Sequence, residues 1–132
     1  MYLDSLVAQV YKVIEALRPQ RGPYKLAMLY NSVLNASSNW NLIVSADWTD
    51  NLGVADATSV VVHALFEALT PEYRAALGRV TILKTTDPFV RDMTRLYPVL
   101  TKQGGVPVQQ LAAGDVTEGA GFVFYSQPEV AA

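Results

Sequence analysis

The amino-acid sequence predicts an α/β domain, with a mixed sheet of about five strands flanked by helices. Runs rich in β-branched and aromatic residues alternate with segments whose apolar residues recur every three or four positions. Turn residues separate these segments, which follow one another in the order α-β-β-α-α-β-α-β-β. The chain of 132 residues has the length of one domain, which we place at 1–126, followed by a loose tail at 127–132.

The first predicted element is an amphipathic helix. Its apolar stripe consists of Leu3, Leu6, Val7, Val10, Val13, Ile14 and Leu17. We expect Pro19 to end this helix, because proline cannot continue the helical hydrogen-bond ladder. Two strands are then predicted over 24–30 and 39–46, joined by a turn at 35–38 into an antiparallel pair. Segment 24–30 could instead be helical, because leucine and methionine discriminate poorly between the two structures.

The middle of the chain is predicted to be mainly helical. A long helix covers 54–69, after a loop that begins at Asp47. Its core-facing stripe consists of Val54, Ala57, Val61, Ala64, Leu65 and Ala68. A short helix follows, with Thr70 at the N-cap, Pro71 at the first helical position and Gly78 closing its end.

The last third of the chain alternates strand and helix. Residues 79–84 are predicted to form a strand, and Asp87 followed by Pro88 opens another helix. Strands at 106–112 and 120–126 complete the domain. The two strand–helix–strand units demand parallel pairing, whereas the first and last strand pairs are expected to be antiparallel hairpins.

Composition argues against several classes of function. The net charge is −2 and no basic stripe appears, so we expect no nucleic-acid partner. No stretch approaches the roughly 20 apolar residues of a membrane span. The chain contains no cysteine, which suits a cytoplasmic protein without disulfides. Charged residues make up only 17%, against about 25% in an average soluble domain, which predicts apolar surface covered by self-association.

Two predicted strands run out into polar loops that the sheet is expected to bring together. The candidate ligand-binding residues are Asp47, Trp48 and Asp50 after one strand, and Lys84, Thr85, Thr86 and Asp87 after the other. Ligands of open α/β sheets bind beyond the carboxyl ends of the parallel strands. Lys84 beside a helix N-terminus would suit an anion, and Asp47 with Asp87 would suit a divalent metal. No cofactor motif accompanies these residues, so we predict no resident cofactor or metal.

Most of these candidates also have an ordinary structural interpretation. Asp87 would cap the helix that begins at Pro88, and Asp50 or Asn51 would cap the long helix. Trp48 would be a buried or interface anchor, because large aromatic side chains mostly bury. Asp47 and Lys84 have no assigned structural role, and a solvated loop charge is the default for each.

The long helix offers a second kind of candidate, a contact surface on its outward face. Phe66 lies there, flanked by Val62 and Leu69, unless another element of the same domain covers them. His63 and Glu67 stand four residues apart on the same face, a spacing that could hold a metal. No third ligand is signalled, so we interpret His63 as an ordinary exposed histidine.

No catalytic constellation emerges from these residues, because the chain has a single histidine and shows neither the Gly-x-Ser-x-Gly motif nor the residue order of a Ser/His/Asp triad. The leading hypothesis is a cytoplasmic, non-enzymatic interaction or assembly module that forms homo-oligomers, with a different protein as a further partner. The alternative is an enzyme or sensor that binds a small anion or a divalent metal in the crevice at the carboxyl ends of the parallel strands.

Overall fold

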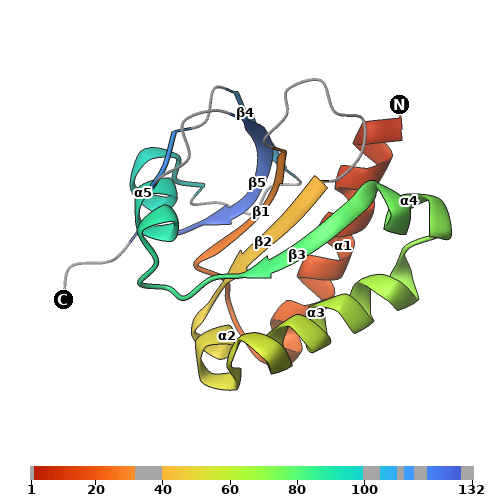
Figure 1. Ribbon diagram of the computed structural model, residues 1–132, viewed down its shortest axis with the longest axis horizontal. Helices are drawn as coiled ribbons and strands as arrows, with labels where there is room; N and C mark the ends of the chain where they lie inside the picture. Colours follow the sequence, from red (N-terminus) through yellow and green to blue (C-terminus); the bar gives the residue numbers. More distant parts are fainter. Residues whose placement is uncertain (1, 32–39, 100–104, 110–111, 115–118, 129–132) are drawn as a thin grey trace.

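The computed structural model describes residues 2–31, 40–99, 105–109, 112–114 and 119–128, and it confirms the mixed α/β class (Figure 1). The helices are α1 (Tyr2–Arg21), α2 (Asp47–Leu52), α3 (Val54–Ala68), α4 (Pro71–Ala76) and α5 (Pro88–Leu96). The strands are β1 (Leu26–Asn31), β2 (Trp40–Ser45), β3 (Leu77–Ile82), β4 (Val106–Val108) and β5 (Ala120–Ser126). Segment 24–30 is therefore mainly strand and not helix.

The five strands form one sheet in the order β3-β2-β1-β5-β4, so β3 and β4 are its two edges. β1 pairs antiparallel with β2 and β5, whereas β2 pairs in parallel with β3. The first predicted pair and the first predicted parallel unit are confirmed, although the turn at 35–38 lies outside the described residues.

The prediction of parallel pairing in the second strand–helix–strand unit, β3-α5-β4, is wrong. After α5 the chain enters β4 at the opposite edge of the sheet, where it pairs antiparallel with β5. β4 has three residues and is shorter than the predicted strand at 106–112. Pro107 lies in its middle and has no N–H to donate, which suits an edge position and not one between two neighbours.

Helices cover both faces of the sheet and divide the core into two clusters (Figure 1). α1 and α3 lie on one face, and the fully buried side chains there include Leu6, Val10, Ile14, Leu42, Val61 and Phe124. α5 covers the other face with Phe89, Val90 and Met93. The predicted stripe of α1 is buried from Leu6 to Leu17, and the side chain of Leu3 lies outside the described part.

The predicted stripe of α3 is buried only in its middle. Ala57, Val61 and Leu65 have exposed fractions of 4% or less, whereas Val54 is 54% exposed and Ala68 also faces solvent. The ends of α3 therefore extend beyond the part of the sheet that the helix covers.

Two helix ends depart from the predicted ones. α1 continues through Pro19 to Arg21, because a proline in the last turn removes a single hydrogen bond. The N–H of Gly22 then donates to the C=O of Arg18 at 2.8 Å and closes the helix. Gly78 does not close α4 but lies within β3, and the C-cap of α4 is Leu77.

Residues 47–52 form a short helix, α2, where a loop was expected. The hydroxyl of Thr49 accepts a hydrogen bond from the N–H of Ala46 at 2.9 Å and donates one to its C=O at 2.8 Å. Gly53, with a φ of 88°, separates α2 from α3 and is the N-cap of α3. The predicted cap by Asp50 or Asn51 is therefore wrong.

The described residues after β5 are tied to the fold. The N–H of Gln127 donates to the C=O of Lys25 at 2.8 Å, and its side-chain amide donates to the C=O of Val99 at 3.1 Å. The predicted tail at 127–132 is thus attached at its first residue, and 129–132 lie outside the described part. Within the described ranges, no helix combines the length and apolar character needed to cross a membrane.

Candidate functional site

The ends of β2 and β3 meet at one rim of the sheet, as predicted from the parallel pairing. The segments that follow them, the helix α2 after β2 and the loop after β3, touch through Asp50 and Thr85. The hydroxyl of Thr85 donates to the Asp50 carboxylate at 2.6 Å, and its backbone N–H donates to the same carboxylate at 3.2 Å. We call the residues 46–50 and 83–87 the polar rim. The structure therefore brings the two candidate loops together.

Several side chains at the polar rim already serve the fold. The carboxylate of Asp50 holds the opposite loop, and that of Asp87 accepts a hydrogen bond from the N–H of Phe89 at 2.9 Å. This confirms Asp87 as the N-cap of α5. Trp48 is only 8% exposed and packs edge-on against Tyr24, with 6.0 Å between the ring centres. The predicted buried role of Trp48 is therefore confirmed, and its ring presents no open stacking surface.

The other candidates at the polar rim face solvent. Asp47, Lys84 and Thr86 are exposed, and within the described residues their side chains make no hydrogen bond or ion pair. The described residues include no group of three or more acids or histidines that could hold a metal. The polar rim thus gathers the predicted residues, and none of the three cavities described below is lined by them.

An apolar groove lies at the β3 edge of the sheet, where α3 and α4 flank the strand. Its volume is about 490 Å³. We call it the Phe66 groove and define it by the lining residues Val62, Phe66, Leu69, Pro71, Arg74 and Val80. Phe66 is 62% exposed and Val62 is 43% exposed. Leu69 is 3% exposed, so the expectation that it flanks Phe66 on the surface is wrong. It belongs to the core because α3 ends at Ala68 and the chain turns inward there.

Arg74 forms one wall of the Phe66 groove. Its guanidinium carbon lies 4.1 Å from the centre of the Phe66 ring, a cation–π contact. The Nε atom of Arg74 is buried and has no hydrogen-bond partner among the described residues. The guanidinium group of Arg74 thus packs over the Phe66 ring, which remains 62% exposed.

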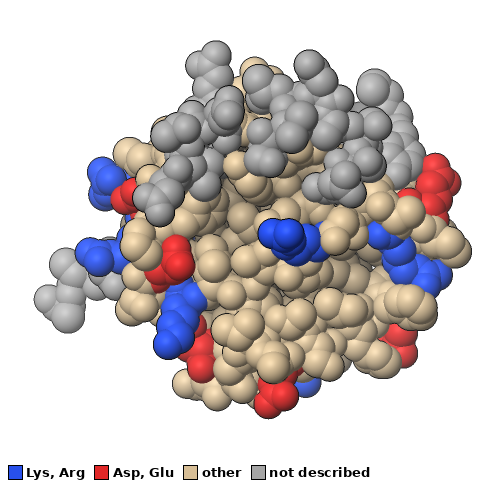
Figure 2. All heavy atoms as spheres, in the orientation of Figure 1, with Lys and Arg blue, Asp and Glu red and all other residues tan. Residues whose placement is uncertain are grey.

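Figure 2 shows the side of the molecule on which β3, α3 and α4 lie in front. Uncharged residues occupy most of this face, and acidic side chains lie mainly at its periphery. Of the uncharged residues on α3, Val62 and Phe66 are large apolar side chains that remain exposed beside the groove.

A second hollow lies between α1 and α3 and encloses about 760 Å³. His63 and Glu67 lie on its wall, 3.2 Å apart, and both side chains are more than two-thirds exposed. The interpretation of His63 as an ordinary exposed histidine agrees with this geometry.

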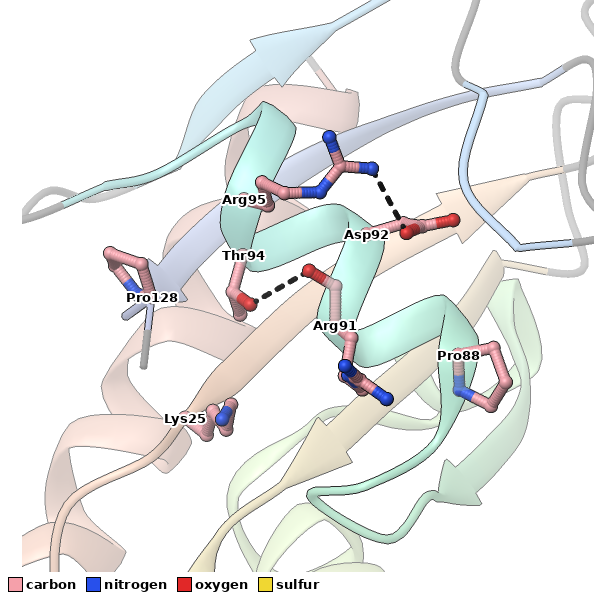
Figure 3. Close-up of a pocket in the computed structure, with 7 residues that line it drawn as sticks. All are labelled: Lys25, Pro88, Arg91, Asp92, Thr94, Arg95 and Pro128. Atoms are coloured by element: carbon pink, nitrogen blue, oxygen red, sulfur yellow. Dashed lines mark hydrogen bonds and ion pairs between the residues drawn. The ribbon is translucent and has the colours of Figure 1, made fainter. Parts of the chain in front are cut away.

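A third hollow, of about 400 Å³, lies beside α5 and carries basic side chains (Figure 3). Lys25 and Arg91 lie on the side of α5 that faces β1, whereas Arg95 extends toward Asp92. The carboxylate of Asp92 accepts hydrogen bonds from the N–H of Gly114 at 2.8 Å and from Arg95 at 3.2 Å, which together lower its pKa. We call this the basic hollow.

The basic hollow lies at the same end of the sheet as the polar rim. Lys25 directly precedes Leu26, which pairs with Ser45 at the end of β2 and with Ser126 at the end of β5. An anion site was predicted at this end of the sheet, but on Lys84. The basic residues that line a cavity there are instead Lys25, Arg91 and Arg95, none of which was a candidate.

Sequence reasoning also missed Arg74 and Val80 as parts of the Phe66 groove. Both depend on β3 being an edge strand, and strand order is not visible in a single sequence. One available signal was the exposed pair Gly78 and Arg79 inside a strand, because glycine and charge are typical of sheet edges.

Comparisons with known proteins identify no relative of this chain. No protein family matches the chain, and neither curated proteins nor solved structures show significant similarity to it.

Proposed function

We propose that this chain is a non-enzymatic assembly module that self-associates through the face containing the Phe66 groove. The observation that carries the proposal is Phe66 itself, which stands 62% exposed in the wall of an apolar groove. Burying a fully exposed side chain of this size is worth about 1.5–3 kcal/mol. Because Phe66 is 62% exposed, each copy gains about 1–2 kcal/mol, and a symmetric contact gains this twice. The low charged fraction of 17% and the absence of cysteine support the same proposal, including a cytoplasmic location.

Burial of one aromatic side chain does not by itself produce a stable dimer. Association costs at least about 4 kcal/mol in lost translational and rotational freedom. The proposal therefore requires the rest of the groove, including Val62 and Val80, to be covered with Phe66. In that arrangement Phe66 is the central anchor of the contact, and the peripheral charges remain hydrated.

Light scattering coupled to size-exclusion chromatography tests this proposal. We expect a dimer or larger assembly at tens of micromolar, weakened about 100-fold or more by Phe66→Asp, which corresponds to about 2.7 kcal/mol. Val54→Asp is the matched control, because Val54 is also exposed on α3 but does not line the groove. A wild-type chain that stays monomeric at this concentration would contradict the proposal.

A small anion in the basic hollow is the second candidate function, favoured by Lys25 and Arg91 lining one cavity. Two cations near each other attract phosphate or carboxylate groups through charge-assisted hydrogen bonds. Inorganic phosphate should then raise the melting temperature of the wild-type chain and not that of Arg91→Ala. An equal rise in both would point to a general salt effect and remove this candidate.

A further inference from the structure

The outer edge of β3 carries unpaired backbone groups next to the Phe66 groove. β3 is the last strand of the sheet on that side, and within the described residues no strand pairs with its outer edge. The N–H of Leu83 donates to the C=O of Val44 on β2 at 3.0 Å. The N–H and C=O groups of successive residues point alternately to the two sides of a strand. Those of Thr81 therefore also point toward β2, and those of Val80 and Ile82 point outward. Val80 thus belongs both to the open edge and to the groove.

We infer that a second copy of this chain adds its own β3 antiparallel to this edge, around a two-fold axis at Val80. The inference rests on the proposed self-association and specifies its geometry. An axis through Val80 lets the Val80 residues of the two copies exchange both backbone hydrogen bonds. The two sheets then form one continuous sheet, and the contact is isologous because each copy contributes the same strand.

The residue that lies opposite Arg79 supports the same position of the axis. With the axis at Val80, Arg79 lies opposite the partner's Thr81, which is uncharged. An axis at Arg79 would place two arginines directly opposite each other, which is unfavourable. An axis at Thr81 would place Arg79 against the partner's Leu83, a residue that packs on the α5 cluster. Of these three positions, Val80 is the one that puts neither the partner's Arg79 nor an apolar residue directly opposite Arg79.

The same axis brings the two apolar faces together. The side chains of Val80 and Ile82 lie on the sheet face covered by α1 and α3. An axis perpendicular to a continuous sheet keeps α3 of both copies on that one face. The Phe66 groove of each copy then adjoins that of its partner, so one contact covers both the strand edge and the apolar groove. This match between edge and groove is why we assign a second copy, and not a foreign strand, as the occupant.

Cysteine cross-linking tests the geometry directly, because the natural chain has no cysteine. Paired residues on neighbouring antiparallel strands lie about 5.5 Å apart at Cα, within the range that a disulfide spans. We expect Val80→Cys to cross-link two chains under mild oxidation. Arg79→Cys should cross-link to Thr81→Cys when the two variants are mixed. Leu96→Cys, 49% exposed on α5, is the control and should not cross-link at the same concentration.

A proline substitution provides a second, independent test. Val80→Pro removes an N–H that makes no bond to β2, so the fold should persist while the dimer dissociates about 10-fold or more easily. Val80→Ala keeps the N–H and should remain dimeric. If Val80→Pro does not fold, the cross-linking at position 80 decides alone.

The outcomes separate this inference from the proposed function. A wild-type dimer that is weakened by Phe66→Asp but shows no cross-link at Val80→Cys would overturn the β3 axis and leave self-association standing. A wild-type monomer that forms no cross-link would overturn both, and would mean that a different partner covers this face. Cross-linking at position 80 together with a dimer sensitive to Val80→Pro supports both.

Discussion

The polar rim and the Phe66 groove differ in what their side chains already contact. At the rim, Asp50 binds Thr85 and Asp87 caps α5, so these polar groups find their partners within the fold. At the groove, Phe66 contacts Arg74 on one side and is open on the other. In this molecule, polar residues at the ends of the strands are therefore weaker indicators of binding than apolar side chains that the fold leaves uncovered.

The two aromatic residues of these regions should respond very differently to truncation. Trp48→Ala removes a core side chain that is 8% exposed, and we expect a loss of about 3–5 kcal/mol in the free energy of unfolding. Phe66→Ala should cost less than about 1 kcal/mol in the monomer, because the ring is largely exposed. Urea denaturation at dilute concentration measures both. Similar losses would mean that Phe66 is part of the core.

Tyr24, which packs against Trp48, should make stability depend on alkaline pH. Burial, with Tyr125 and Glu15 nearby, raises the pKa of its hydroxyl above the ordinary value. The folded chain thus holds this proton more tightly than the unfolded chain does. The resulting stabilisation is complete below about pH 10 and is lost as pH rises through the folded-state pKa.

Tyr24→Phe should reduce this alkaline loss of stability, measured by urea denaturation between neutral pH and strongly alkaline pH. At neutral pH the variant should lose about 1 kcal/mol, because the hydroxyl donates to the C=O of Ile14 at 2.8 Å. If the free energy of unfolding of Tyr24→Phe falls as steeply at alkaline pH as that of the wild type, the loss of stability comes from other titrating groups.

Asp50→Ala should break the link between the two loops of the polar rim. We expect the free energy of unfolding to fall by about 1–2 kcal/mol, because the carboxylate accepts hydrogen bonds from both the hydroxyl and the N–H of Thr85. Asn51→Ala, which replaces an exposed neighbour, is the control. The oligomeric state should not change. A loss of self-association in Asp50→Ala would mean that the rim takes part in the contact.

Asp87→Ala should remove the cap of α5 and cost about 1 kcal/mol, whereas Asp87→Ser should restore most of the loss. Chemical denaturation of the two variants measures their free energies of unfolding. A larger loss that serine does not restore would indicate a role for the carboxylate charge beyond capping.

The smallest effect is expected at Asp47 and Lys84, the two rim charges that have no partner among the described residues. The double variant Asp47→Ala with Lys84→Ala should change the free energy of unfolding by less than about 0.5 kcal/mol. A thermal-shift screen of phosphate and divalent cations should give the same result for this variant as for the wild type. A ligand that stabilises only the wild type would restore the polar rim as a binding site.

Local patterns were enough to predict the class of the fold and the meeting of the two rim loops. Asp87 followed by Pro88 marks a helix start by local chemistry alone, and the parallel pairing of β2 with β3 follows from the long helical connection between them. The place of β4 could not be predicted, because strand order depends on contacts between distant residues. For the same reason the edge position of β3, and with it the groove beside Val80, was not visible.

The candidate site was predicted in part. The loops containing Asp50 and Thr85 do meet, but a sequence does not show which polar groups will bind one another and which will stay available for a ligand. Phe66 was identified as outward-facing because it lies opposite the buried stripe of α3. Leu69 was misplaced because the helical pattern was extended one residue past the end of α3.

Hydrogen exchange as a function of protein concentration tests the central claim most directly. If two copies meet at β3 and the Phe66 groove, the amides of Val80 and Ile82 should exchange more slowly at high concentration than at dilution. The amides of the polar rim should exchange at the same rate at both concentrations. Slowing at the rim or on α5 in place of β3, or no slowing anywhere, would contradict the account.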